Sequence, residues 1–118
     1  MKKYFLCFLL LFIFLTGCSS DDSVVNYVQA KEKIINEGAI LVDVRTSDEY
    51  DEGHIEGAVL LTLDDIDEES SANIIKSKST PVIVYCKSGK RSAQALEILK
   101  KLGYEKVYDL GAMSNWKE

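Results

Sequence analysis

Short apolar runs alternate with longer mixed segments along most of the chain. Four of the runs have the length and side chains of buried strands, at 39–42, 58–61, 81–85 and 106–110. The mixed segments carry apolar residues at helical spacing, over 27–36, 64–77 and 92–102, and one more short helix is predicted over 113–116. Strands that alternate with helices predict an α/β domain, with a mostly parallel central sheet flanked by helices on both faces.

Glycine and capping residues mark where the predicted helices begin and end. Gly38 and Gly103 follow the first and third long helices, where glycine commonly takes the left-handed conformation that closes a helix. Asp64 and Ser92 have side chains that can accept hydrogen bonds from a first helical turn. They are the predicted N-caps of the second and third long helices.

The amino-terminal segment differs from the rest of the chain. After Lys2 and Lys3, the run 4–15 is apolar throughout, which is too short to span a bilayer but typical of a secretory signal. The following Leu15-Thr16-Gly17-Cys18 resembles the lipidation box of bacterial lipoproteins. This resemblance implies an exported protein held in the cell envelope by a lipid on Cys18. A plain signal peptide or an anchor helix is the alternative.

This reading divides the chain into a signal peptide (1–17), a lipidated cysteine with its tether (18–24) and one domain (25–118). Removal of 1–17 takes two lysines from fourteen basic residues and leaves twelve against nineteen acids, a net charge of −7. This acidic balance argues against a nucleic-acid partner and against a polybasic membrane-binding face.

Cysteine usage singles out one thiol. Of the three cysteines, Cys7 lies in the predicted signal and Cys18 is the predicted lipid site, so Cys86 is the only thiol left in the domain. No intrachain disulfide can form there. An unpaired thiol in an exported protein indicates a reactive group, although a lone cysteine can also be a small core residue.

The residues that follow Cys86 favour a bound anion. A tight loop between the strand 81–85 and the next helix points several backbone N–H groups at one place. Gly89 allows the required backbone angles, and Lys87, Lys90 and Arg91 add positive charge. The same field should lower the pKa of Cys86 and favour the nucleophilic thiolate. A solvated surface turn is the alternative explanation of these cations.

Four stretches together resemble a known family. They are Leu41-Val42-Asp43-Val44-Arg45 with Glu49-Tyr50, Gly53-His54-Ile55-Glu56-Gly57-Ala58, Tyr85 to Ser92, and Asp109-Leu110-Gly111 with Trp116. In this order they are similar to the motifs of a single-domain rhodanese, a thiosulfate sulfurtransferase. One departure is Ala112, which stands where the closing motif of the family has a second glycine. We expect this position to lie far from the sulfur chemistry.

The resemblance implies that Cys86 takes a sulfane sulfur from thiosulfate, a persulfide or a polysulfide and passes it to a thiol or cyanide. The implied donor-binding residues are Lys87, Ser88, Gly89, Lys90, Arg91 and Ser92, and the implied supporting residues, with a buried ion pair, are Asp43, Arg45 and Glu49. His54 is expected to serve its turn rather than act as a base. No cofactor or metal is implied, and a monomer is expected.

Other functions remain open at this point. A binding or persulfide-carrier module could use the same fold without turnover. Phosphatases and arsenate reductases of related fold place five residues between the cysteine and the arginine, whereas four separate Cys86 from Arg91. This shorter loop favours sulfur over a tetrahedral phosphate or arsenate.

Overall fold

Four parallel strands form the central sheet of the computed structural model, which describes residues 20–118. The strands are β1 (Ile40–Asp43), β2 (Val59–Leu60), β3 (Val82–Cys86) and β4 (Val107–Ala112). They lie in the order β2-β1-β3-β4, so β3 is an inner strand. The predicted α/β class is confirmed. The predicted signal peptide and Cys18 lie outside the described residues, and no helix within 20–118 is long and apolar enough to cross a membrane.

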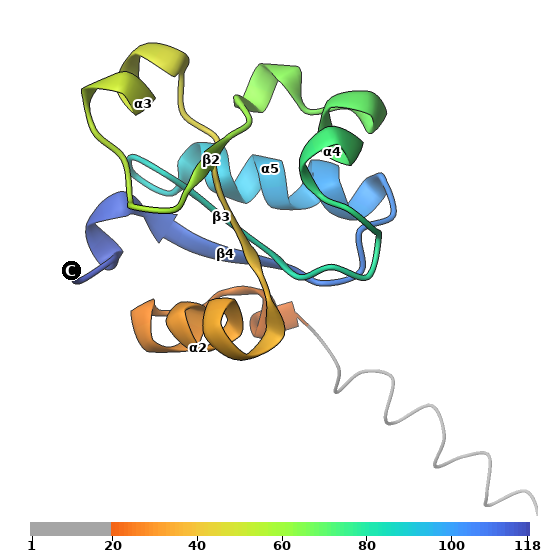
Figure 1. Ribbon diagram of the computed structural model, residues 1–118, viewed down its shortest axis with the longest axis horizontal. Coiled ribbons are helices and arrows are strands. Elements are labelled where there is room, and N and C mark those ends of the chain that lie inside the picture. Colours follow the sequence, from red (N-terminus) through yellow and green to blue (C-terminus); the bar gives the residue numbers. More distant parts are fainter. Residues whose placement is uncertain (1–19) are drawn as a thin grey trace, which may run out of the picture.

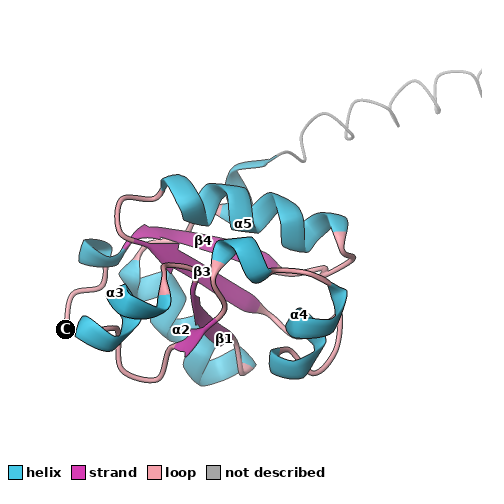
Figure 2. Cartoon of the chain, turned by 90° about the horizontal axis from the view of Figure 1, so that it is seen from above, coloured by secondary structure: helices cyan, strands magenta, loops and turns pink. Residues whose placement is uncertain are grey.

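Helices cover both faces of the sheet (Figures 1 and 2). One face packs against α2 (Tyr27–Glu37), and the other against α4 (Glu68–Ile74) and α5 (Lys90–Lys101). Side chains of a strand point alternately to the two faces. Ile83 and Tyr85 therefore belong to the α2 side of the core, while Val84 and Cys86 belong to the α5 side.

The predicted helix over 64–77 is wrong in its extent. A short 3-10 turn, η2 (Leu63–Asp65), comes first, and α4 begins only after Asp67. Asp67 rather than Asp64 is the cap, because its carboxylate accepts the Ser70 N–H at 2.8 Å. Ile66 between them has an extended backbone, which separates the two turns.

Three other helical elements differ from the prediction. A six-residue helix, α3 (Ser47–Glu52), lies where the sequence shows no apolar face, and none of its residues is buried. It begins at a capping box in which the Thr46 hydroxyl accepts the Glu49 N–H. Helix α5 starts at Lys90, so Ser92 lies inside the first turn and is not its cap. The predicted closing helix is a 3-10 turn, η3 (Met113–Asn115).

The register of β3 and β4 places the carboxyl ends of the two strands side by side. The ladder shifts by one residue after Val84, so that Tyr85 pairs with Gly111 and Cys86 with Ala112. Gly111 has φ of 86°, a left-handed conformation that suits glycine. The shift brings the end of β4 beside the cysteine and the loop that follows it, at the edge where parallel sheets commonly bind ligands.

Candidate active site

Cys86 ends β3 with its side chain turned toward the first turn of α5. The residue has no solvent-exposed surface, whereas the next two residues of the loop, Lys87 and Ser88, are exposed. Within the described residues it is the one cysteine, and it is free of any disulfide. The structure therefore places the thiol at the base of a short loop that solvent reaches from above.

The sulfur of Cys86 accepts hydrogen bonds from the loop and from the helix start. The backbone N–H of Gly89 lies 3.0 Å from Sγ, and that of Ser92 lies 3.3 Å from it. Burial works to raise the pKa of the thiol, but hydrogen bonds from Ser92, Gly89 and Ser88 outweigh burial, and the pKa lies below its ordinary value. The loop thus favours the thiolate, as the sequence predicts.

Gly89 connects this loop to the end of β4. Its φ of 101° requires a conformation that residues with a Cβ rarely adopt. A Cβ at this position would lie 3.7 Å from the Ala112 backbone nitrogen and 3.7 Å from the Gly111 Cα. The expectation that Ala112 is remote from the sulfur site is therefore wrong, because the ladder shift brings its backbone into contact with the loop.

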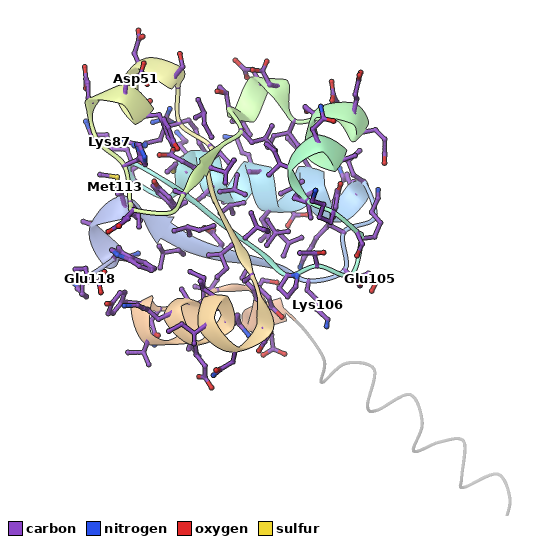
Figure 3. The ribbon with its side chains drawn as sticks, viewed as in Figure 1. Asp51, Lys87, Glu105, Lys106, Met113 and Glu118 are labelled. Atoms are coloured by element: carbon purple, nitrogen blue, oxygen red, sulfur yellow. The ribbon has the colours of Figure 1, made fainter. Side chains whose placement is uncertain are left out.

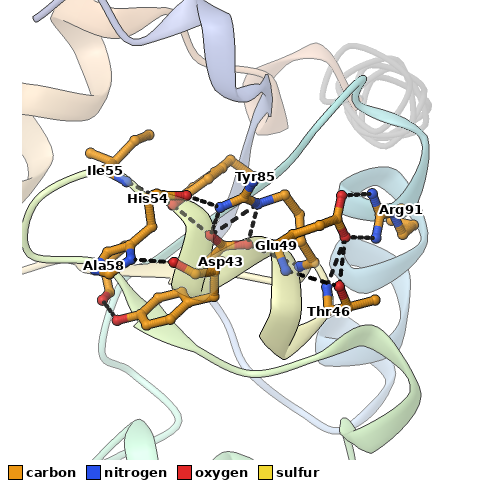
Figure 4. Close-up of polar contacts among 11 residues, drawn as sticks. Asp43, Thr46, Glu49, His54, Ile55, Ala58, Tyr85 and Arg91 are labelled. Atoms are coloured by element: carbon orange, nitrogen blue, oxygen red, sulfur yellow. Dashed lines mark hydrogen bonds and ion pairs between the residues drawn. The ribbon is translucent and has the colours of Figure 1, made fainter.

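Arg91 is held by a carboxylate from α3. Its two terminal nitrogens donate to Glu49 Oε1 at 2.8 Å and Oε2 at 3.1 Å, a bidentate pair (Figure 4). The pKa of Glu49 lies well below its usual range. The hydrogen bonds from the Arg91 guanidinium lower it most, and the hydrogen bond from the Thr46 backbone N–H is the second cause. Arg91 therefore ties the loop to α3 in this structure.

The remaining cations of the loop are differently placed. Lys87 and Lys90 are exposed, and neither makes an ion pair with any described carboxylate. Ser92 is buried and donates its hydroxyl to the Gly89 carbonyl oxygen at 3.1 Å. The binding roles of these residues toward an anion stay predictions.

A buried network lies behind the cysteine (Figure 4). The Arg45 side chain donates to both carboxylate oxygens of Asp43, with its shortest contact at 2.7 Å, and to the Gly53 carbonyl at 2.7 Å. This is the ion pair expected from the sequence, although Glu49 belongs to the Arg91 pair instead. Loss of one buried partner would leave an uncompensated charge and cost about 3–5 kcal/mol.

Tyr85 completes the network and was not anticipated from the sequence. Its hydroxyl donates to Asp43 Oδ2 at 2.7 Å and accepts the Ile55 N–H at 3.1 Å. Burial, with the neighbouring Asp43, raises the pKa of Tyr85 far above its usual range, so the hydroxyl keeps its proton. The sequence signal for this role is a tyrosine directly before the cysteine on a strand whose other residues before it are aliphatic.

His54 supports the turn that precedes β2. Its ring stacks on Tyr50 with the centroids 3.6 Å apart, and Nδ1 donates to the Tyr50 carbonyl oxygen at 2.8 Å. The Tyr50 hydroxyl in turn donates to the Ala58 carbonyl oxygen at 2.6 Å. His54 is exposed and stacked flat, an arrangement that fixes the turn. Within 20–118, no group of three His, Cys, Asp or Glu side chains is placed to hold a metal ion.

Comparisons with known proteins agree with this geometry. The family described as "Rhodanese-like domain" matches residues 27–118. Thiosulfate sulfurtransferase PspE of Escherichia coli is 35% identical over 74 residues, which cover 63% of this chain and 70% of the relative. Thiosulfate sulfurtransferase GlpE of Coxiella burnetii is 32% identical over 94 residues, which cover 79% of this chain and 85% of the relative.

Solved structures show the same fold. A structure described as rhodanese with anions from E. coli has a TM-score of 0.62 at 34% identity, over 65% of this chain and 89% of that one. The human single-domain sulfurtransferase TSTD1 has a TM-score of 0.67 at 23% identity, over 81% of this chain and 97% of that one.

Replacement of Ser92 by alanine should raise the pKa of the Cys86 thiol. The Ser92 hydroxyl lowers the pKa of this thiol when its proton turns from the Gly89 carbonyl oxygen to the sulfur, and the change removes this hydroxyl but leaves the Ser92 backbone N–H in place. The ultraviolet absorbance of the thiolate, followed against pH in a chain that begins at Ser19, measures this pKa. Ser88→Ala is the matched control, because Ser88 acts through its backbone and should leave the pKa unchanged. Equal titration of the two variants would contradict the assignment.

Glu49→Gln should make the domain less stable at neutral pH by about 1 kcal/mol, because it removes a partly buried bidentate pair. The pKa of Glu49 is lowered in the folded state, so this contribution is present above the unfolded value of about 4.3 and is lost as the pH falls below it. Urea unfolding at a series of pH values tests this. The difference in unfolding free energy between wild type and Glu49→Gln should disappear in acid. Glu52→Gln, which changes an exposed residue of the same helix, should have the unfolding free energy of wild type at every pH.

Proposed function

The chain belongs to the rhodanese-like family, and we propose that it transfers sulfane sulfur through a persulfide on Cys86. The observation that carries the proposal is the sulfur of Cys86, which accepts the Gly89 and Ser92 N–H groups at the base of the loop. These donors favour a thiolate and would equally hold the terminal sulfur of a persulfide. The named thiosulfate sulfurtransferases that resemble the chain support the same chemistry.

In the first step, the Cys86 thiolate attacks the outer sulfur of thiosulfate. The S–S bond breaks, sulfite leaves with the electron pair, and the cysteine carries a persulfide. In the second step, a thiolate or cyanide attacks the outer sulfur of the persulfide and the Cys86 thiolate returns. The protein returns to its starting state after the two steps, with no net gain or loss of electrons. The cycle therefore needs no redox cofactor.

The surrounding residues would serve the two steps in different ways. Lys87 and Lys90 are exposed beside the loop, where their charges would attract a sulfur anion to an otherwise acidic protein. Arg91 would act through Glu49 by holding the loop. The Asp43–Arg45 pair and Tyr85 would keep the end of β3 in place, so they are positioning residues.

A second part of the proposal concerns location. The apolar run and the Cys18 box support export and lipidation, which would hold the domain at a membrane in the cell envelope. A monomer with soluble sulfur anions as donors fits this picture.

Thiosulfate should add one sulfur atom to Cys86. Intact-mass and peptide mass spectrometry of the treated protein should show the adduct, and subsequent cyanide should remove it as thiocyanate. Cys86→Ser should show neither. An adduct that forms and transfers once but supports no repeated turnover would favour the binding or carrier alternative, and no adduct with thiosulfate, polysulfide or persulfide would overturn the proposal. Cysteine-dependent hydrolysis of an aryl phosphate would favour the phosphatase alternative.

The native protein should carry a diacylglycerol on Cys18. Mass spectrometry of the amino-terminal peptide, after expression of the full chain in a bacterium, should show the lipid with residues 1–17 removed. Cys18→Ser should abolish both the modification and sedimentation with membranes. A soluble mature chain with an unmodified Cys18 would refute the anchor without affecting the sulfur chemistry.

A further inference from the structure

The first described residues lie toward the amino ends of the strands, which we call the amino edge of the sheet, whereas Cys86 lies at the carboxyl ends. Val24 forms a parallel bridge with Asp109, and the Val25 N–H donates to the Asp109 carbonyl oxygen at 3.0 Å. Because the bridge is parallel, residues before Val24 run toward the amino end of β4, while Cys86 pairs with Ala112 at its carboxyl end. Four residues of strand separate the level of Ser23 from that of Cys86, or about 13 Å along the sheet.

A second contact fixes the same placement. Lys100, in the last turn of α5, donates to the Ser23 hydroxyl at 2.8 Å. Helix α5 starts beside Cys86 and runs back along the sheet, so its last turn lies at the amino edge of the strands. Five residues join Cys18 to Ser23 and can span at most about 17 Å. An anchor on Cys18 would therefore hold the domain close to the membrane by its amino edge.

The amino edge carries a group of exposed lysines, which we call the lysine edge: Lys76, Lys100, Lys101 and Lys106. They come from the end of α5 and from two loops, at 75–81 and 102–106. These loops are joined, because the Glu105 N–H donates to the Lys78 carbonyl oxygen at 2.9 Å and the Lys78 ammonium group donates to the Leu102 carbonyl oxygen at 2.6 Å. None of the four lysines pairs with a carboxylate of residues 22–118.

Acidic groups near the lysine edge are few and partly neutralised. Glu105 is exposed there, and so is Asp22 in the short turn η1 (Ser20–Ser23). Glu68 is paired with the Lys78 ammonium group at 2.9 Å, and Glu37 lies 3.9 Å from the Lys33 ammonium group. The lysine edge is thus weakly positive on a domain that is negative as a whole.

Part of the negative charge lies at the other end of the molecule. Segment 46–56, which includes α3, contains five acidic residues and no lysine or arginine. Figure 3 shows Asp51 of this segment far from Lys106 and Glu105, which lie at the opposite end of the molecule from Lys87 and Met113. The domain is therefore electrically polarised, which the net charge of the sequence conceals.

We propose that the lysine edge faces an anionic lipid surface next to the anchor, and that Cys86 and the acidic segment 46–56 face away from it. This inference rests on the proposed anchor at Cys18. The lysines are attracted to anionic headgroups, and the acidic segment is repelled by them, so both forces turn the domain the same way. Lys87 and Lys90 lie at the far edge, beside the acidic residues of α3. In this orientation the site receives donors and acceptors from the aqueous compartment, not from the bilayer.

The test uses chemical attachment, so that it does not depend on lipidation in the cell. A chain of residues 18–118 with Cys86→Ser contains the whole described fold and a single thiol, Cys18, which is coupled to a maleimide phospholipid in vesicles. Energy transfer to a dansyl headgroup lipid is measured from Trp116, the one tryptophan, which lies beyond the carboxyl end of β4. It is compared with a Trp116→Phe/Ser79→Trp chain, which moves the reporter to the exposed loop of the lysine edge.

On vesicles that contain phosphatidylglycerol, transfer should be severalfold higher from position 79 than from Trp116, and the difference should decrease as salt screens the charges. Lys101→Glu/Lys106→Glu should abolish the preference. Lys31→Glu/Lys117→Glu is the matched control, since Lys31 lies 5.8 Å from the Trp116 ring at the other edge, and should retain it. Equal transfer from both reporters, or greater transfer from Trp116, would overturn the orientation. Circular dichroism confirms that each variant is folded.

Discussion

The carboxylate of Asp43 holds together the carboxyl ends of the strands, where the candidate site lies. It is fully buried, it ends β1, and it accepts hydrogen bonds from Arg45 and from Tyr85 of β3. Arg45 and Tyr85 then extend the network to Gly53 and Ile55 in the turn before β2. One buried negative charge thus joins the ends of β1 and β3 to the turn before β2, and its cost of burial is met only while all of these partners stay in place. Cys86 follows Tyr85 directly, so the position of its backbone is set by this network.

A second ion pair controls the other side of the cysteine. Glu49 of α3 and Arg91 of α5 are 42 residues apart in the chain, and their bidentate contact joins a helix without a buried face to the loop that holds the sulfur. The two pairs share no atom. The first fixes the strand end beneath Cys86, and the second fixes the loop above it. With both sides held in this way, the N–H groups of Gly89 and Ser92 converge on the sulfur.

Local patterns predicted much of this arrangement, and the errors have physical causes. The strands 39–42 and 81–85 could be recognised because both faces of a parallel sheet are buried and the runs are apolar throughout. Helix α3 could not, because Thr46 capping and a distant arginine stabilise it, not an apolar face. The roles of Arg91 and Ala112 were also beyond local reasoning. Arg91 could equally have faced an anion, and the contact of Ala112 with the loop depends on a register shift between two strands.

The complete burial of Cys86 has a kinetic consequence. A sulfur atom without exposed surface in this structure can be reached only when the residues around it move, so access should favour small reagents over bulky ones. The same burial shields the thiol from oxidants, which attack accessible thiolates.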